Sequence, residues 1–481
     1  MKKNFISVLL TSAMVASLLA GCAAAPAPAA APAPAAEEEA VVEEAPAEEV
    51  AEEVEEASDE TGSVYYLQFK PEVDEAWQEL AATYTEQTGV PVTVLTAASG
   101  TYDTTLQAEM AKTEAPTIFN IGNADAAKTW NDYTLDLKDT ALWEHLADKS
   151  LCLENDGKVA GIANCYECYG IIYNKTILED YCTVDGAVIS SIDEIQDFDT
   201  LKAVCEDING RVDEINEALG TELTEAFASS GLDDGSSWRF SGHMAGLALY
   251  YEFKDDGCDL IAGEPEIDGT YVENFKNVWD LYVGTSAADP ATLTSGAFNA
   301  EEEFGMGEAV FYQNGDWEFA AFNNPDNGYL VTGEDVAMMP IYYGVDDATE
   351  GLAVGTENYW AINSQASEAD IQATKDFLEW VITSDEGRDA ITNQMGLSTP
   401  FDTFTGDFAS QNKLAGCVAD YAAAGKTSVA WSFNATPNTD NWRAGVVAGL
   451  VEYTCNGGSF DGVTEAFVDG WAKEWALAHE E

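Results

Sequence analysis

Beyond its N-terminal segment, the chain alternates between two hydrophobic periodicities, and this alternation limits the possible folds more than any other feature. Residues 64–69, 91–95 and 116–121 are short apolar runs of strand length. Residues 72–88 and 103–112 carry apolar side chains at helical spacing. A strand–helix–strand–helix–strand order predicts an α/β fold, in which helices cover a parallel sheet.

Two loops follow strands of this predicted sheet, and ligands of parallel sheets usually bind at the carboxyl ends of the strands. The first loop spans residues 97–103 and the second spans residues 122–125. Their polar and aromatic side chains are candidate ligand contacts: Ser99, Tyr102, Asp103, Asn123 and Asp125. Asp103 and Asp125 have a second interpretation as caps of the helices that follow them.

The N-terminus has the pattern of an export signal. Lys2 and Lys3 precede an apolar stretch that is short for a membrane span, so residues 1–21 are expected to be a signal peptide. The sequence Leu-Ala-Gly-Cys that ends at Cys22 resembles a bacterial lipobox, which implies cleavage before Cys22 and diacylation of its thiol. Two acyl chains are sufficient for stable membrane anchoring.

Residues 22–62 consist mostly of Ala, Pro, Glu and Val, so we expect an extended, lipid-anchored tether. The chain as a whole has 87 acidic and 20 basic residues, a net charge of −67. Such a charge repels phosphate backbones, which excludes nucleic acid as a partner. It also argues against an anionic ligand and favours a neutral or cationic one.

Cysteine and histidine usage limits the possible metal sites. Eight of the nine cysteines lie beyond Cys22, and they permit up to four disulfides or a set of buried thiols. Cys165 and Cys168 have the spacing of a zinc or redox motif, but the chain has no second such pair and only three histidines. We therefore expect no metal site and no cofactor.

Several segments, taken in order, resemble the extracellular solute-binding proteins of ABC importers, especially the sugar-binding branch related to maltose-binding protein. The lipobox and the strand–helix opening are followed by these segments: 99–103, 115–119, 169–175, 307–317, 376–380 and 384–387. The resemblance covers nearly all of the chain after residue 63.

The resemblance implies a two-lobed fold of the periplasmic-binding-protein type, with hinge strands between the lobes. The first lobe is expected at residues 63–168 plus 356–396, and the second at residues 169–355 plus 397–481. The chain would cross between the lobes three times, and the lobes would close on a ligand. The implied partners are a small-molecule ligand, permease subunits of an ABC importer, and the membrane through the lipid anchor.

A sugar site needs aromatic rings for stacking and polar groups for the hydroxyls. Asp316 and Trp317 follow an apolar strand, so they are expected at its carboxyl end, although Trp317 has an alternative place in the core face of a helix. Trp238 is another candidate ring, and the expected role of its neighbour Arg239 is a structural ion pair. We expect Trp431 in the core.

Two further groups of candidates flank the expected crossings between the lobes. Tyr166 and Tyr169 lie near the first crossing, where they either stack on the ligand or fill the space between the lobes. Glu357, Asn358 and Tyr359 lie near the second crossing and combine an acceptor, an amide and a ring.

The sequence contains no zinc-protease, phosphate-loop or serine-hydrolase motif, so we expect a binding protein and not an enzyme. The predicted function is that of the substrate-binding lipoprotein of an ABC importer, at the outer face of the cytoplasmic membrane, with a mono- or oligosaccharide as ligand. The alternatives are a cationic solute such as a polyamine or quaternary amine, a short peptide, or a surface adhesin without a transport role.

Overall fold

The computed structural model describes residues 61–97, 101–296, 298–356 and 358–479. The expected signal peptide 1–21, the lipidation site Cys22 and the tether up to residue 60 lie outside the described residues. Two candidate ligand contacts, Ser99 and Glu357, also lie outside them.

The first sheet has the strand order β2-β1-β3-β10-β5-β4. Strands β1, β2 and β3 are parallel, as predicted, whereas β10 joins β3 and β5 in antiparallel register. The strands span these residues: Val64–Gln68 (β1), Val92–Thr96 (β2), Ile118–Ile121 (β3), Cys152–Asn155 (β4), Lys158–Ala163 (β5) and Tyr359–Ile362 (β10).

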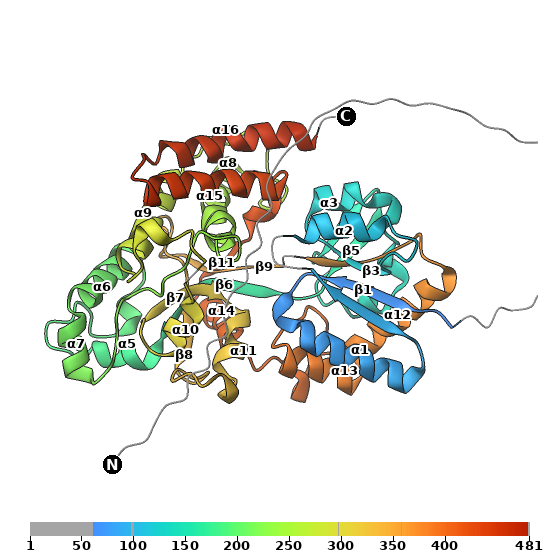
Figure 1. Ribbon diagram of the computed structural model, residues 1–481, viewed down its shortest axis with the longest axis horizontal. Coiled ribbons are helices and arrows are strands. Elements are labelled where there is room, and N and C mark those ends of the chain that lie inside the picture. The colour runs from blue at the N-terminus through green and yellow to red at the C-terminus, as the bar shows by residue number, and fades with distance from the viewer. Residues whose placement is uncertain (1–60, 98–100, 297, 357, 480–481) are drawn as a thin grey trace, which may run out of the picture. The chain divides into compact units, whose positions relative to one another are not determined.

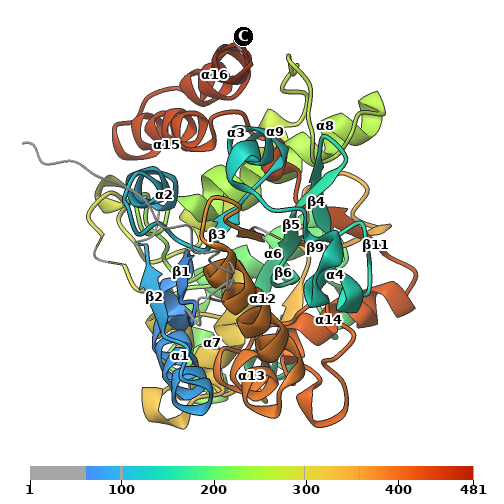
Figure 2. The same ribbon diagram turned by 90° about the vertical axis from the view of Figure 1, so that its right-hand side faces the viewer.

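Helices cover both faces of this sheet and complete the first lobe (Figures 1 and 2). On one face lie α1, α12 and α13, and on the other lie α2 and α3. Their bounds, with that of the short helix α4, are Asp74–Thr88 (α1), Tyr102–Met110 (α2), Ala124–Thr129 (α3), Ala141–His145 (α4), Glu368–Thr383 (α12) and Asp385–Asp389 (α13). The predicted strand–helix alternation is therefore confirmed.

The second sheet is mixed and has the order β11-β9-β6-β7, with β8 also paired to β6. Along β6 the side chains alternate between two hydrophobic clusters, as strand geometry requires: Tyr169 and Ile171 face one, and Cys168 and Ile172 face the other. The strands span Glu167–Asn174 (β6), Phe311–Gly315 (β7), Val336–Met339 (β8), Glu350–Gly355 (β9) and Thr427–Ala430 (β11).

Helices also pack against both faces of the second sheet. The larger cluster includes side chains of Lys175–Tyr181 (α5), Phe198–Gly210 (α6), Val212–Leu219 (α7), Ala245–Asp256 (α8), Val272–Gly284 (α9), Thr439–Cys455 (α15) and Asp461–Ala478 (α16). The smaller cluster includes side chains of Ala300–Gly305 (α10), Phe319–Phe322 (α11) and Lys413–Ala423 (α14). Helices α15 and α16 lie side by side in both views (Figures 1 and 2). The chain thus has the two-lobed α/β fold that the resemblance implied.

The chain passes between the two sheets three times. The first two connections, 164–166 and 356–358, are short, and the third lies between α13 and α14. Leu397 and Phe401 still pack in the cluster of the first sheet, so the side chains just after the predicted boundary at 396 belong with the first lobe. The exact lobe boundaries stay a prediction.

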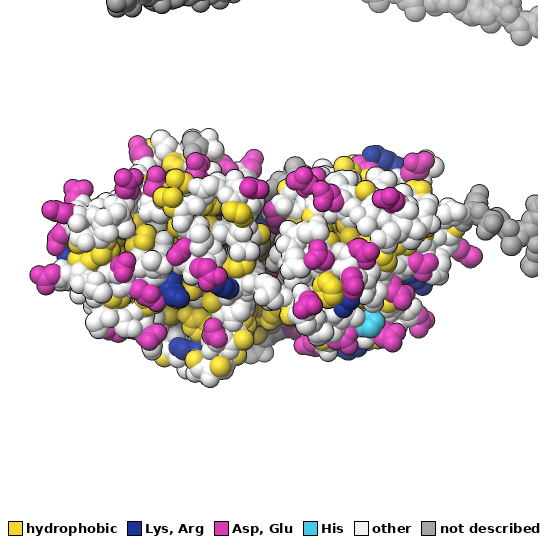
Figure 3. Space-filling view, turned by 90° about the horizontal axis from the view of Figure 1, so that it is seen from below, with side chains coloured by type: hydrophobic (Ala, Val, Ile, Leu, Met, Phe, Trp, Pro, Cys, Tyr) yellow, Lys and Arg dark blue, Asp and Glu magenta, His cyan; other side chains and the backbone are white. Residues whose placement is uncertain are grey.

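Among the described residues, the eight cysteines form no disulfide with one another; three of them are buried and five are half-buried, so the interpretation as buried thiols fits only Cys165, Cys168 and Cys205. No group of three or more metal-ligating side chains occurs in that part of the chain. Within the same ranges, no helix has the length and the apolar character needed to cross a bilayer. Acidic side chains are spread over the face drawn in Figure 3, with few basic ones among them.

Candidate functional site

Six rings meet where β6 begins and β7 ends, and we call them the aromatic cluster: Tyr169, Trp238, His243, Trp317, Trp431 and Phe433. The rings of Tyr169 and His243 stack with centroids 3.7 Å apart and planes 3° apart. The Trp238 and Trp317 centroids are 5.9 Å apart. These two indoles are half-buried and the other four rings are buried, so the cluster presents indole surface outward.

Two glycines at strand ends make room for two of the tryptophans. A Cβ atom at Gly315 would come within 3.0 Å of the Trp317 ring, closer than real Cβ atoms approach a neighbour. A Cβ atom at Gly355 would lie 2.8 Å from Cγ of Trp431. Both glycines lie on strands that pair with β6. The tryptophan rings therefore lie directly on the backbone of the sheet.

A π-helix supplies two further members of the cluster. It spans Arg239–Met244, with Trp238 as its N-terminal flanking residue and His243 within it, and α8 continues from its end. π-Helices are rare and frequently occur at functional sites, because the wider turn changes the direction of its side chains.

Several buried polar atoms in and beside the cluster have no hydrogen-bond partner among the described residues, and they include Tyr169 Oη, His243 Nδ1, Trp431 Nε1, Ser432 Oγ and Arg239 Nε. Burial, followed by the charges of Arg443 and Arg239, holds the pKa of His243 well below its usual value, so its ring is neutral. Buried polar groups are nearly always hydrogen-bonded. A group of such atoms behind two half-buried indoles makes this cluster the candidate ligand site.

A buried ion pair joins the first lobe to this site. Lys70, which follows β1, places its Nζ atom 2.7 Å from Oε1 of Glu167 at the start of β6. Gln68 fixes the Lys70 backbone, because Lys70 N–H donates to Gln68 Oε1 at 2.7 Å and Gln68 Nε2 donates to the Lys70 carbonyl at 2.8 Å. The Lys70 ammonium lies 5.2 Å from the centroid of Trp317. Groups from both lobes thus contact one another at the cluster.

Two carboxyl groups beside the cluster are buried and have raised pKa values. Asp316 accepts a hydrogen bond from the Cys168 N–H at 3.0 Å. Burial raises its pKa, and the negative charge of Glu167 raises it further. Burial, followed by the charge of Glu301, raises the pKa of Glu318 to about 8. Both carboxyls therefore favour the protonated state near neutral pH.

Two arginines lie over rings of the cluster. The Arg239 guanidinium carbon is 4.5 Å from the Trp238 centroid, and its Nη2 donates to the Tyr312 hydroxyl at 3.4 Å. In the described part of the chain, Arg239 forms no ion pair with an acidic side chain, so the structural ion pair expected for it is wrong. The Arg443 guanidinium carbon is 5.2 Å from the Phe433 centroid.

The family model of bacterial extracellular solute-binding proteins matches residues 79–416, which is well over half of the chain. The chain belongs to this family. No curated protein sequence matches it. The family is one of binding proteins that act outside the cytoplasm, as the sequence resemblance implied.

Solved structures with a similar fold include three binding proteins whose names give a carbohydrate or a related ligand. They are the solute-binding protein RafE in complex with raffinose (14% identity, TM-score 0.62, 86% of this chain and 100% of that chain), a chitin oligosaccharide binding protein (17%, 0.61, 86% and 99%) and the acarbose-binding GacH receptor of Streptomyces glaucescens (14%, 0.60, 87% and 99%). At these identities the likeness shows the fold.

Four of the residues singled out from the sequence meet in this solute-binding protein. Tyr169, Trp238 and Trp317 belong to the aromatic cluster. Asp316 lies beside it, but its carboxyl group faces the backbone of Cys168 and the Asn412 amide. Whether these residues contact a ligand stays a prediction.

The candidates from the first-lobe loops mostly have local roles. The Tyr102 hydroxyl donates to the Leu67 carbonyl at 3.1 Å and accepts from the Asn120 N–H at 2.6 Å. Asn123 caps α3 by accepting from a backbone N–H at 2.8 Å. Asp125 does not cap that helix, because its carboxylate pairs with Lys128. Asp103 is exposed in the first turn of α2, and the charge of Arg443 acts on it.

Of the candidates from the expected crossings, Tyr169 is in the cluster, whereas Tyr166, Asn358 and Tyr359 make other contacts. Tyr359 is 5% exposed and packs inside a hydrophobic cluster of the first lobe, because its position in β10 directs its ring to that face. Tyr166 packs against the smaller core of the second lobe, and its N–H donates to the Ser398 carbonyl. Asn358 accepts through its backbone carbonyl from the Thr356 hydroxyl at 3.0 Å.

Sequence reasoning placed neither Lys70, His243, Phe433 nor Arg443 in the site, and it assigned Trp431 to the core. Trp431 is indeed buried, at 2% exposure, yet its ring belongs to the cluster. A usable signal was present, since Trp431 directly follows a short strand, like Trp317. His243 and Arg443 lie inside helices and have no such signal.

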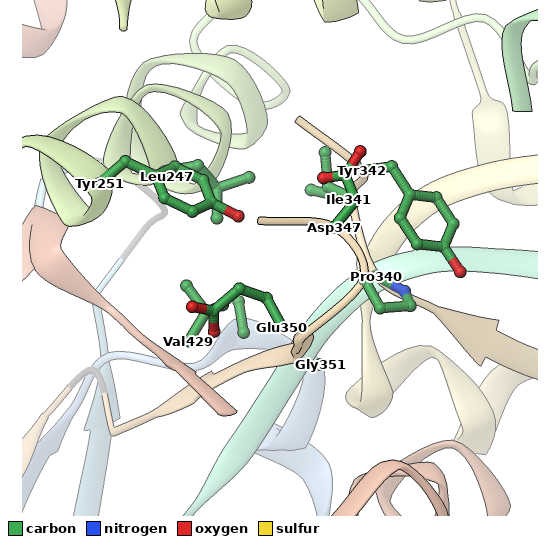
Figure 4. Close-up of a pocket in the computed structure, with 10 residues that line it drawn as sticks. Leu247, Tyr251, Pro340, Ile341, Tyr342, Asp347, Glu350, Gly351 and Val429 are labelled. Carbon is green, nitrogen blue, oxygen red and sulfur yellow. The ribbon is translucent and has the colours of Figure 1, made fainter. Parts of the chain in front are cut away.

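A separate small pocket between α8, β9 and β11 is structural (Figure 4). Two carboxylates, Asp347 and Glu350, line it, but both have protein partners. Asp347 accepts from the N–H groups of Phe198 and Tyr343 at 3.0 and 2.9 Å, and Glu350 pairs with Lys254. These acids therefore complete the fold of the second lobe.

Proposed function

We propose that this solute-binding protein captures a carbohydrate at the aromatic cluster and delivers it to the permease of an ABC importer. The observation that carries the proposal is the group of buried polar atoms that have no partner among the described residues and lie among the rings of the cluster. Sugars offer hydroxyls that both donate and accept hydrogen bonds, together with flat C–H faces that stack on indoles. The carbohydrate ligands named for proteins of similar fold support the same ligand class.

A cationic solute is a weaker candidate than the sequence alone suggested. A cation cage needs free ring faces. Here the protein's own Lys70, Arg239 and Arg443 lie over rings of the cluster, at 4.5 to 5.2 Å from the centroids. A second cation at these faces would be repelled by those already present.

The transport part of the proposal rests on the family and on the N-terminus. We propose that the protein is exported, acylated at Cys22 and held at the outer face of the membrane, where the lobes close on the sugar and present it to the permease. The proposal includes no catalytic step. A surface adhesin without a transport role would not need the unpartnered polar atoms.

Intrinsic tryptophan fluorescence tests the proposal, because three indoles belong to the cluster. We expect a saturable change with one family of sugars in a panel of mono- and oligosaccharides, polyamines, betaines and short peptides. A ligand at about 100 times its dissociation constant should also stabilise the fold by about 2.7 kcal/mol. Saturable binding of amines alone, or of no compound, would contradict the carbohydrate assignment.

A matched pair of variants then locates the site. Trp317→Ala should weaken sugar binding by about 5- to 150-fold, since a buried stacking ring contributes about 1–3 kcal/mol. Trp143→Ala is the control, because Trp143 is also a half-buried indole with a lysine over its ring, but it packs on the core of the first lobe. Equal loss of affinity in both variants would remove Trp317 from the site.

A further inference from the structure

Among the residues that the structure describes, Arg239 is a basic side chain without an ion-pair partner, in a very acidic protein. The chain has 87 acidic residues and only 20 basic ones. Two other arginines show the usual outcome: Arg211 pairs with Asp207 at 3.0 Å, and Arg388 pairs with Asp385 at 2.8 Å. No such pair forms at Arg239 within the residues that the structure describes, and its Nε atom is buried there without a partner.

The described surroundings of Arg239 give its charge no direct ion pair. Its guanidinium lies on the Trp238 face, and its one hydrogen bond to a side chain, with the Tyr312 hydroxyl, is long at 3.4 Å. Glu318 is the carboxyl group that acts on it electrostatically. Among the described residues Glu318 forms no ion pair with Arg239, and burial, followed by the charge of Glu301, raises the pKa of Glu318 to about 8 even though the charge of Arg239 lowers it, which weakens Glu318 as a countercharge.

Arg239 is also placed where a ligand in the aromatic cluster would meet it. Trp238 contacts both Trp317 and His243, at centroid distances of 5.9 and 5.6 Å. The charges of Arg239, Arg443 and Lys70 all act on the His243 ring. All three cations therefore contribute positive potential at the His243 ring, although Lys70 is also paired with Glu167.

We propose that Arg239 receives a carboxylate of the ligand, so that the preferred ligand is an acidic carbohydrate such as a uronic acid or an oligosaccharide that contains one. The guanidinium fork matches a carboxylate in two-point hydrogen bonding, and stacking on Trp238 fixes its orientation. The sugar ring would lie on the neighbouring indoles. The inference rests on the proposed function, since it assigns the class of sugar bound at the same site.

This assignment differs from the expectation drawn from the net charge of −67. At physiological salt, exposed charges are screened beyond about 8 Å. The many surface carboxylates therefore slow the approach of an anionic ligand. The affinity of a ligand carboxylate that touches a guanidinium depends mainly on that direct contact. The net charge predicts the on-rate and not the ligand preference.

Calorimetry with matched sugars tests the proposal on the purified full-length protein. The acidic probes are glucuronate, galacturonate and digalacturonate, and the neutral partners are glucose, galactose and galactobiose. We expect at least one acidic probe to bind about 10-fold or more tightly than its neutral partner. Neutral sugars that bind equally well or better would overturn the acidic preference and leave the proposed function intact, whereas no sugar binding at all would overturn both.

Substitution of Arg239 provides the second arm. Arg239→Gln should weaken binding of the preferred acidic sugar by about 10- to 100-fold, the loss expected for a charge-assisted hydrogen-bonded pair, and should weaken binding of its neutral partner clearly less, because only the acidic sugar loses the charge contact. Binding of the neutral sugar also shows that the variant is folded. Lys202→Gln, on the exposed face of α6, is the control for the same change in net charge.

A third variant separates charge from geometry. Arg239→Lys keeps the charge but loses the two-point fork, so it should recover only part of the affinity for the acidic sugar. It also serves if Arg239→Gln proves unstable. An acidic preference that persists undiminished in both Arg239 variants would overturn the role assigned to this residue.

Discussion

The close contact between Gly315 and Trp317 leads to a prediction about the Trp317 indole. It distinguishes the effect of displacing this ring from the effect of removing it. In Gly315→Ala, the new methyl group would lie within 3.0 Å of the Trp317 ring. Carbon atoms in contact prefer about 3.5–4.0 Å, and several atoms of the ring lie far inside that distance, so the ring has to shift by more than about 1 Å. The backbone at Gly315 has φ −93°, which alanine adopts without strain. The effect therefore comes from the displaced indole.

We expect Gly315→Ala to weaken ligand binding by about 5-fold, the lower end of the range for complete loss of the ring, because the indole is moved and not removed. Overpacking should also lower the unfolding free energy by about 1–3 kcal/mol. Titration calorimetry with the ligand from the fluorescence screen measures the first effect, and urea unfolding measures the second.

The control is Gly351→Ala, another strand glycine of the second sheet. A Cβ atom there meets its nearest neighbour, Cβ of Lys426, at 3.4 Å, which is ordinary contact. This variant should keep its ligand affinity. Unchanged affinity in Gly315→Ala, together with a measurable loss of stability, would show that the placement of Trp317 does not matter for binding and would refute the reasoning.

Three further predictions concern stability and anchoring. The pKa of Glu318 is raised from 4.5 to about 8 in the fold, so its stabilising effect is complete below pH about 4.5 and is lost as the pH rises through 8; Glu318→Gln should make the unfolding midpoint less dependent on pH between 5 and 9. Trp442 is 1% exposed and donates to the Phe467 carbonyl at 3.0 Å, so Trp442→Ala should cost about 3–5 kcal/mol in urea unfolding. Cys22→Ser should abolish incorporation of labelled palmitate and release the protein from the membrane fraction; retention of both label and membrane association in this variant would contradict acylation at Cys22.

The N-terminal strands and helices of the first lobe were predictable because the sequence signals for them are local. The apolar run that became β1 and the helical spacing that became α1 each depend on neighbouring residues only. The resemblance supplied the second lobe and the crossings, which no local periodicity reveals. The packing of Leu397 and Phe401 with the first lobe was missed, since an apolar side chain in a loop does not show which core receives it.

The members of the candidate site that lie on strands or directly after them were predictable. Trp317 follows β7, and Tyr169 lies on β6, which pairs with that strand, so both positions followed from the chain order. Tyr359 was misleading, because an aromatic residue at the start of a strand points to either face, and here it faces a core. His243 and Arg443 reach the cluster from a π-helix and from α15, and only the tertiary packing of these helices brings them together.

The thiols that flank the first connection make it possible to observe motion between the lobes without an added probe. Cys165 and Cys168 lie on either side of Tyr166 and are 0% and 1% exposed. An alkylating reagent reaches them only when this connection opens, so the rate of their modification, with and without sugar, reports how often the solute-binding protein opens there. Suppression of that rate by ligand would measure the kinetics of its closure.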